Sequence, residues 1–196
     1  ELLRRAVDSV LSQTYSNIEI IVVNDGSNDG TASFLEGISI NKKIKVINNN
    51  YSIGACKSRN IAISRAMGKF VTGLDDDDYF LPDRISNFVN EWNQLSEKNV
   101  KFGCLFDSSV KRTTFGSSIV NKKNQVSPSD ILMQNYIGSQ IFCLRSQMLE
   151  AGLFRENLLA WQDWDMWVRF VRMHGQAINL KKSSYVIDES HSFFRI

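Results

Sequence analysis

Residues 18–30 of the chain read Ile-Glu-Ile-Ile-Val-Val-Asn-Asp-Gly-Ser-Asn-Asp-Gly. A short run rich in β-branched residues, followed directly by Asn, Asp and Gly, indicates a strand that ends in a tight turn. Nearly continuous apolar strands are typical of parallel sheets, which helices cover on both faces. Ligands of open α/β sheets bind at the carboxyl ends of the strands, so the turn that carries Asp25 is a candidate binding site.

The segments around this stretch alternate between helical and extended patterns. Helices are expected at residues 1–13, 31–38 and 54–67 and from Pro82 onward. Besides the strand before Asp25, strands are expected at 44–47, 70–74 and 101–106. This alternation predicts an α/β fold with a doubly wound, mostly parallel sheet flanked by helices. Because the chain starts within a helix, we expect the first strand of such a sheet to be missing before Glu1.

The second half of the chain has weaker patterns. A polar loop is expected up to Asn124, and Ser127 followed by Pro128 marks the start of a helix. Another helix presents Trp164 and Trp167 to the core and ends at Gly175, and residues 177–188 predict two short strands. We find neither an internal repeat nor a linker, so residues 1–196 are expected to form a single domain.

The composition excludes several classes of protein. Lys and Arg number 23 against 21 Asp and Glu, which argues against a dedicated nucleic-acid binder because such proteins carry a basic excess. The three cysteines form no Cys-x-x-Cys pair, so a zinc site or a disulfide framework is not expected, and we interpret them as buried thiols in a reducing compartment. Asp accounts for 13 of the 21 acids, and four of these stand in a row.

The run Asp75–Asp78 directly follows an expected buried strand. Four adjacent carboxylates repel one another, and a divalent cation would offset that repulsion. In an extended segment Asp75 and Asp77 point the same way with Cα atoms roughly 6.6 Å apart, which favours one carboxylate on a metal and the other on a ligand hydroxyl. Oxygen ligands suit Mg²⁺ or Mn²⁺. The alternatives are a solvated acidic loop and a weak calcium site.

A second acidic cluster begins at Gln162 and contains Asp163 and Asp165. On a helix these two side chains differ in direction by about 200°, so one pocket cannot easily use both. Asp165 has the i, i+4 spacing for a surface ion pair with Arg169. Asp163 is either a helix cap or a group of a binding site, with the neighbouring Trp161 and Trp164 available to stack on a sugar or to fill the core.

Basic residues and histidines leave further alternatives open. Arg59, in the helix expected at 54–67, is either a phosphate contact or part of a solvated face. His174 lies at a helix end and is interpreted as a C-terminal charge. His191, in a polar tail, is either incidental or a ligand.

Together these segments resemble family-2 glycosyltransferases of the GT-A fold over nearly the whole chain. The first helix, the nucleotide-binding turn, the Gly…Ala-Arg-Asn segment, the Asp-x-Asp motif and the Glu-Asp acceptor motif correspond to residues 6–15, 20–31, 54–60, 73–78 and 162–169. Two residues depart from the family pattern: Ser58 replaces Ala, and Gln162 replaces Glu. A neutral amide can still bind a sugar hydroxyl.

The resemblance implies a role for each matching residue. Asp25 would bond the nucleotide base, Arg59 would lie near the nucleotide, and Asp75 or Asp76 would hold the ribose. Asp77 would bind the metal, Mn²⁺ or Mg²⁺, with His191 as a second ligand, and Asp163 would be the general base. Residues 1–100 would form the nucleotide-sugar-binding half and residues 101–196 the acceptor-binding half.

The implied activity is inverting, metal-assisted transfer of a sugar from a nucleotide sugar, with UDP favoured, to a saccharide or lipid-linked acceptor. The implied setting is bacterial polysaccharide biosynthesis in the cytoplasm. If the protein associates peripherally with the membrane, the implied location is the inner face of that membrane. Nucleic acid is not an expected partner. One alternative is a sugar-nucleotide pyrophosphorylase or nucleotidyltransferase, although no glycine-rich phosphate loop is visible. The other is a non-catalytic module that binds sugar or calcium.

Overall fold

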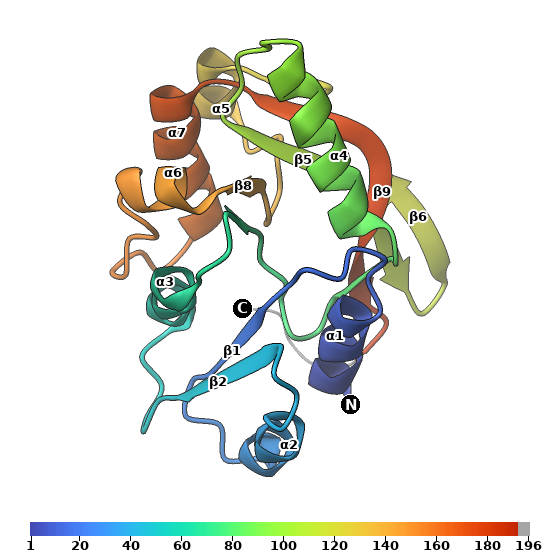
Figure 1. Cartoon of the computed structure of the whole chain (residues 1–196), viewed down its shortest axis with the longest axis vertical. Coiled ribbons are helices and arrows are strands. Elements are labelled where there is room, and N and C mark those ends of the chain that lie inside the picture. The colour runs from blue at the N-terminus through green and yellow to red at the C-terminus, as the bar shows by residue number, and fades with distance from the viewer. Residues whose placement is uncertain (192–196) are drawn as a thin grey trace.

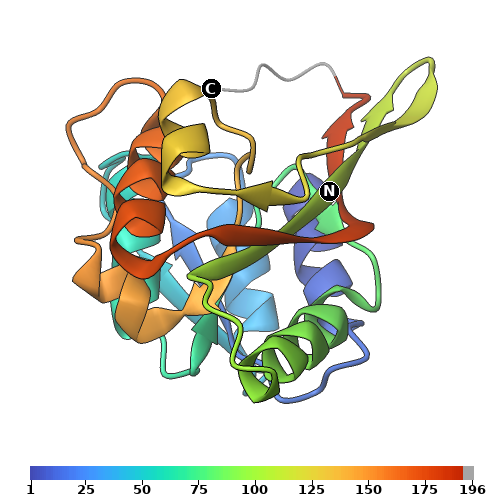
Figure 2. The same ribbon diagram turned by 90° about the horizontal axis from the view of Figure 1, so that it is seen from above.

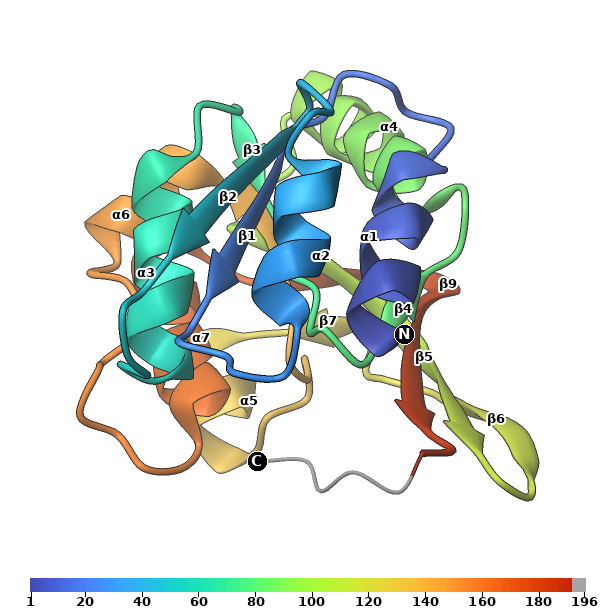
Figure 3. The same cartoon turned by 90° about the horizontal axis from the view of Figure 1, so that it is seen from below.

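The structure, a computed structural model, describes residues 1–191 and contains two sheets with helices around them (Figure 1). Residues 192–196, the end of the expected acceptor half, lie outside the described residues. The smaller sheet pairs β1 (Ile20–Asn24) with β2 (Ile44–Asn48) in parallel. Figure 3 shows α2 (Thr31–Ile38) and α3 (Ala55–Arg65) beside these two strands, with α1 (Leu2–Leu11) next to α2.

The larger sheet is mixed. Its order is β3-β8-β5-β9-β4, with β6 paired to β5 and β7 to β9. The bounds are β3 (Phe70–Val71), β4 (Tyr79–Phe80), β5 (Cys104–Thr113), β6 (Gly116–Val120), β7 (Gln125–Val126), β8 (Phe142–Leu144) and β9 (Ala177–Glu189). Among the strand pairs that residues 1–191 form in this sheet, only β5 and β9 run parallel.

The α/β fold with flanking helices is therefore confirmed, whereas the expectation of a mostly parallel sheet is wrong. An apolar run shows that both faces of a strand are covered, but it does not show in which direction the neighbouring strands run. The turn Thr114–Phe115 is one example, since a connection of two residues can only join antiparallel strands.

Two other expectations are corrected in the same sheet. The polar loop expected up to Asn124 is largely the hairpin of β5 and β6, whose polar residues occupy an exposed strand. The two short strands expected at 177–188 are one long strand, β9, with a positive φ at Lys181 beside a shift in register against β5. A β-bulge of this kind interrupts the sequence pattern without ending the strand.

The core lies on both faces of the larger sheet. Leu105 packs with Phe88 and Trp92 of α4 (Arg84–Glu97), whereas its neighbours Cys104 and Phe106 belong to the cluster formed with α7 (Gln162–His174). This alternation is the two-residue period of a strand covered on both faces. Figure 2 shows β9 and β5 passing between these helices.

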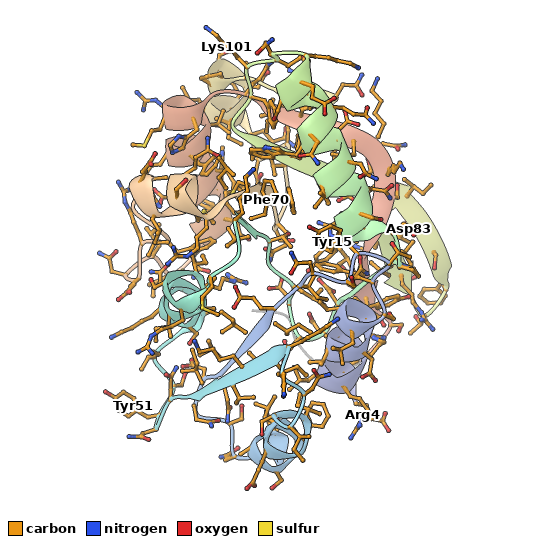
Figure 4. The ribbon with its side chains drawn as sticks, in the orientation of Figure 1. Arg4, Tyr15, Tyr51, Phe70, Asp83 and Lys101 are labelled. Carbon is orange, nitrogen blue, oxygen red and sulfur yellow. The ribbon has the colours of Figure 1, made fainter. Side chains whose placement is uncertain are left out.

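The smaller elements complete this packing. The helices α5 (Pro128–Met133) and α6 (Arg145–Glu150) lie beside α7, and the Ser127 side chain caps α5 as predicted. Phe70, near the centre of the molecule in Figure 4, stacks on Phe142 with ring centroids 4.7 Å apart. The three cysteines are buried and free, as expected. In residues 1–191, no helix has both the length and the apolar character needed to cross a bilayer.

A buried ion pair connects α4 to the larger sheet. Arg84 is 1% exposed and donates a hydrogen bond of 2.7 Å to the Asp107 carboxylate, which also accepts one from the Ser184 backbone N–H. The Arg84 guanidinium lies over the rings of Phe80 and Phe88. The arginine is therefore enclosed, and Asp107 supplies the negative charge that compensates it.

Asp107→Ala is expected to reduce the free energy of unfolding by about 3–5 kcal/mol, because it leaves a buried cation without its counter-charge. Urea unfolding at neutral pH measures this loss. Asp8→Ala, which removes an exposed carboxylate from α1, is the control and should stay within about 0.5 kcal/mol of the wild type. A similarly small loss for Asp107→Ala would contradict a stabilising role of this pair.

Candidate active site

Asp25 holds the turn that follows β1. Its carboxylate accepts hydrogen bonds from the backbone N–H groups of Ile53 and Gly54, both 2.9 Å, and from the side chains of Asn49, Ser52 and Ser58. Burial would raise the pKa of Asp25, but these five donors outweigh it and hold the pKa well below its usual range. Asp25 is therefore a fixed anion, and a nucleotide base would have to compete with the chain's own donors for it.

The same turn requires a glycine. Gly26 has φ of 75°, and a Cβ atom there would lie 2.7 Å from the backbone between Tyr51 and Ser52. Because the turn at the end of β1 touches the segment that leads into α3, only a residue without a side chain fits. This contact fixes Asp25 relative to α3.

Three of the predicted site residues meet from three different elements. Arg59 of α3 donates a hydrogen bond of 2.8 Å to Asp75, which follows β3, and its other terminal nitrogen lies 3.7 Å from a carboxylate oxygen of Asp163 in α7. All three side chains are about 30% exposed. Arg59 is thus not on a solvated face, and it links the two carboxylates that the resemblance assigns to donor binding and to the base.

Asp163 has the properties of a proton acceptor. It lies in the first turn of α7, and its Oδ1 atom is buried without a hydrogen-bond donor from residues 1–191. Burial raises its pKa to about 6; the nearby Arg59 opposes this shift, and Asp75 adds to it. A carboxyl group with a pKa near neutrality and an oxygen free to accept is suited to general-base chemistry.

The alternative reading of Asp163 as the helix cap is wrong. Trp161 occupies the N-cap position, with a positive φ of 56°. Gln162 donates its amide to the Leu158 carbonyl. Asp165 faces away from this cluster and pairs with Arg155 and Arg169, as its spacing predicted.

Asp77 and His191 lie side by side at the other end of the acidic run. The His191 Nε2 atom is 3.7 Å from an Asp77 carboxylate oxygen. Two ligands of one octahedral ion at about 2.1 Å would be about 3.0 Å apart as neighbours and about 4.2 Å apart as opposites. The observed separation lies between these two values, so the two side chains are near enough to share one Mn²⁺ or Mg²⁺ ion after a small rotation. Residues 1–191 contain no group of three His, Cys, Asp or Glu side chains that could hold a metal, so a bound diphosphate or water would supply the remaining ligands.

The other two carboxylates of the run differ in their surroundings. Asp76 is exposed. Asp78 is 1% exposed and accepts hydrogen bonds from the Tyr185 hydroxyl and the Asp188 backbone N–H. One carboxylate of the run, that of Asp78, is therefore buried and structural, and the other three line the site or face solvent. The sequence could not indicate which of the four identical residues would be buried.

Two positioning residues were missed by sequence reasoning. The Asn60 side chain, 8% exposed, exchanges hydrogen bonds of 2.8 and 2.9 Å with the backbone C=O and N–H of Phe154, and so ties α3 to the loop that leads into Asp163. Gln140 lies 3.5 Å from Asp75, and a Cβ on Gly73 would overlap its side chain at 2.1 Å. The Arg59-Asn60 pair was the available signal for the first, and nothing in the sequence indicated the second.

Comparisons with known proteins agree on one family. Residues 1–150 match the family described as glycosyl transferase family 2. A protein of Escherichia coli K12 named as a colanic acid biosynthesis glycosyl transferase is 31% identical over all of this chain and 71% of its own length. The GalNAc(5)-diNAcBac-PP-undecaprenol β-1,3-glucosyltransferase of Campylobacter jejuni is 29% identical over all of this chain and 60% of its own length.

Two solved structures share the fold. A fragment of Staphylococcus aureus TarS, residues 1–349, in complex with UDP-GlcNAc superposes with a TM-score of 0.77 at 18% identity, over 97% of this chain and 56% of the fragment. The mannosyltransferase PcManGT of Pyrobaculum calidifontis, in complex with GDP-Man and Mn²⁺, gives 0.67 at 19% identity, over 95% of this chain and 52% of that protein. The chain thus spans about half of the TarS fragment and of PcManGT, about a third of the longer TarS chain, and a larger part of the two relatives above.

Proposed function

The chain belongs to glycosyltransferase family 2, and we propose that it transfers a sugar from a nucleoside-diphosphate sugar to an acceptor hydroxyl. The family and the GT-A fold predicted from five sequence segments are confirmed. The observation that carries the proposal is the junction of Asp75, Arg59 and Asp163, because it places a proton acceptor beside a candidate donor-binding carboxylate. A proton acceptor beside a binding carboxylate is typical of an enzyme that catalyses acyl or glycosyl transfer, and is less expected in a module that only binds a ligand.

In the proposed reaction Asp163 takes the proton of the acceptor hydroxyl while that oxygen attacks the anomeric carbon. Attack on the face opposite the leaving group inverts the anomeric centre. Asp75 or Asp76 holds the ribose, Arg59 fixes the direction of the Asp75 carboxylate, and Asp25 binds the base in place of one of its present donors. Asn60 keeps the loop before Asp163 against α3.

Asp77 and His191 would hold the divalent ion. When bound, such an ion neutralises the negative charge that develops on the departing diphosphate. The carboxylate of Asp77 and the oxygens of a diphosphate suit Mn²⁺ or Mg²⁺, and the PcManGT complex with Mn²⁺ supports a metal of this kind.

The two halves of the chain divide the substrates in this proposal. Residues 1–100 bind the donor, for which the TarS complex with UDP-GlcNAc supports a UDP-sugar, and residues 101–196 bind the acceptor. The names of the two bacterial relatives support a saccharide or lipid-linked acceptor and a role in polysaccharide biosynthesis. We accordingly place the reaction at the cytoplasmic face of the membrane.

The full-length protein incubated with UDP-sugars and Mn²⁺ is expected to release UDP, and to release it faster when an acceptor is present. A thermal-shift series with nucleoside diphosphates and sugar nucleotides, with and without Mn²⁺, would identify the donor through selective stabilisation. Pyrophosphate-dependent chemistry would instead support a pyrophosphorylase. Stabilisation by sugar or calcium without turnover would support a binding module. Either result would replace the proposed function.

A further inference from the structure

Half of the exposed large hydrophobic side chains lie in three short segments. In residues 1–191, fourteen such side chains are exposed, and seven of them fall within residues 113–120, 128–133 and 152–161. We call these seven the apolar rim: Phe115, Ile119, Val120, Leu132, Met133, Leu159 and Trp161. The remaining seven are scattered along the rest of residues 1–191, most of them in loops.

The three segments reach the same side of the molecule. The tip of the β5–β6 hairpin, the helix α5 and the orange loop between α6 and α7 lie along the upper edge of Figure 2 and the lower edge of Figure 3. α5 is also held to α7, the helix that the loop leads into, because the Trp164 indole N–H donates a hydrogen bond to the Ile131 carbonyl. The rim therefore borders one face rather than encircling the protein.

Phe115 is the most exposed residue of the rim. It occupies the two-residue turn of the hairpin and is fully exposed, and every residue of β6 is exposed as well. A hairpin tip usually carries small or polar residues, since turns lie in water. A phenylalanine there has no contact to make within the fold, and it is placed to enter another apolar phase.

Trp161 brings the rim next to the proposed base. It is 79% exposed, it precedes Asp163 by two residues, and it holds a left-handed backbone conformation that is unfavourable for a bulky residue. Indole rings favour the boundary between water and lipid, where the apolar ring and its N–H are both satisfied. An acceptor bound at Asp163 would thus lie within one helical turn of the rim.

The charge beside the rim is positive. Residues 110–126 contain four Lys or Arg and no Asp or Glu. Lys111 pairs with Glu189 and Lys123 with Asp130. Burial lowers the pKa of Lys122 to about 8, so Arg112, which is exposed and hydrogen-bonded to the Tyr79 hydroxyl, is the cation of this segment that is best placed to meet an anionic surface. A basic segment that flanks apolar anchors is attracted to anionic lipid headgroups.

We propose that the apolar rim and the basic hairpin dock on a bilayer that contains anionic phospholipid. The role of this docking rests on the proposed function: a lipid-linked acceptor lies in that bilayer, and docking presents the acceptor hydroxyl to Asp163. The docking itself needs neither donor nor acceptor, so it can be measured without turnover.

The test is flotation of the full-length protein with phosphatidylcholine vesicles, with and without phosphatidylglycerol. We expect binding that requires phosphatidylglycerol and weakens with added salt. Phe115→Ser should weaken it roughly tenfold, since an apolar ring no longer leaves water. Met67→Ser, which removes an equally apolar side chain that is 84% exposed but outside the rim, is the matched control and should bind as the wild type does. Circular dichroism confirms that both variants are folded.

Three results would overturn the inference. The first is equal binding by the Phe115→Ser and Met67→Ser variants, and the second is equal binding to both vesicle types. The third is a dimer in solution that Phe115→Ser dissociates, because the rim would then be a protein interface. Vesicle binding together with no sugar transfer would instead count against the proposed function alone.

Discussion

Asp163→Asn is expected to lower kcat by about a thousandfold and to leave the dissociation constant of the donor within about threefold. The amide has the shape of the carboxylate but cannot take a proton from the acceptor hydroxyl. The Asp75 carboxylate and its hydrogen bond from Arg59 are retained, so the donor site stays formed. Single-turnover transfer gives the first quantity, and calorimetry with a non-hydrolysable donor gives the second.

Asp165→Asn is the control for this substitution. It makes the same chemical change two residues away, on a side chain that pairs with Arg155 and Arg169 outside the site. We expect it to retain wild-type kcat while losing some stability. Comparable turnover by the Asp163→Asn and Asp165→Asn variants would exclude Asp163 as the base.

The pH profile gives an independent measure of the same group. A base works only when deprotonated, so kcat/KM should rise with pH and level off above the pKa of Asp163, about 6 in the free protein. Arg59 opposes the rise of that pKa. Arg59→Met should therefore move the whole profile to higher pH, whereas a purely structural role of Arg59 would lower kcat/KM without moving its midpoint.

Local features of the fold were predictable from the sequence because their causes are local. The helix α2 has the bounds that the pattern predicts, and Ser127 with Pro128 starts α5 through a capping box. The direction of β8 and the continuity of β9 were not predictable. They depend on which strands lie beside them, and those partners are far away in the sequence.

The site divides in the same way. Asp25, Asp75 and Asp163 stand out because each follows a strand or begins a helix, where ligands bind. Asn60 and Asp78 do not stand out, because their partners Phe154 and Tyr185 are 94 and 107 residues away. The roles of both residues depend on tertiary contacts. The sequence contains no sign of the role of Asp78, and its only signal for Asn60 is the position of that residue next to Arg59.

Asp77→Ala is expected to remove the metal dependence of donor binding and to lower turnover by roughly a hundredfold or more. A lost carboxylate ligand leaves the ion held by His191 and the diphosphate alone, and the charge of the leaving group is then less well neutralised. Calorimetric titration of UDP with and without Mn²⁺ measures the first effect. Asp83→Ala, an exposed aspartate at the start of α4, is the control and should keep the Mn²⁺ dependence.

The adjacent Asp78 separates metal binding from folding. Its carboxylate is buried and holds β9 through Tyr185 and Asp188, so Asp78→Ala should lower the free energy of unfolding by about 1–3 kcal/mol. Asp77 is more exposed, and Asp77→Ala should leave unfolding nearly unchanged in the absence of metal. Loss of Mn²⁺ dependence without loss of stability at Asp77, and the reverse at Asp78, would assign the two neighbours to different tasks. Mn²⁺-dependent UDP binding that survives in Asp77→Ala would remove Asp77 from the proposed metal site.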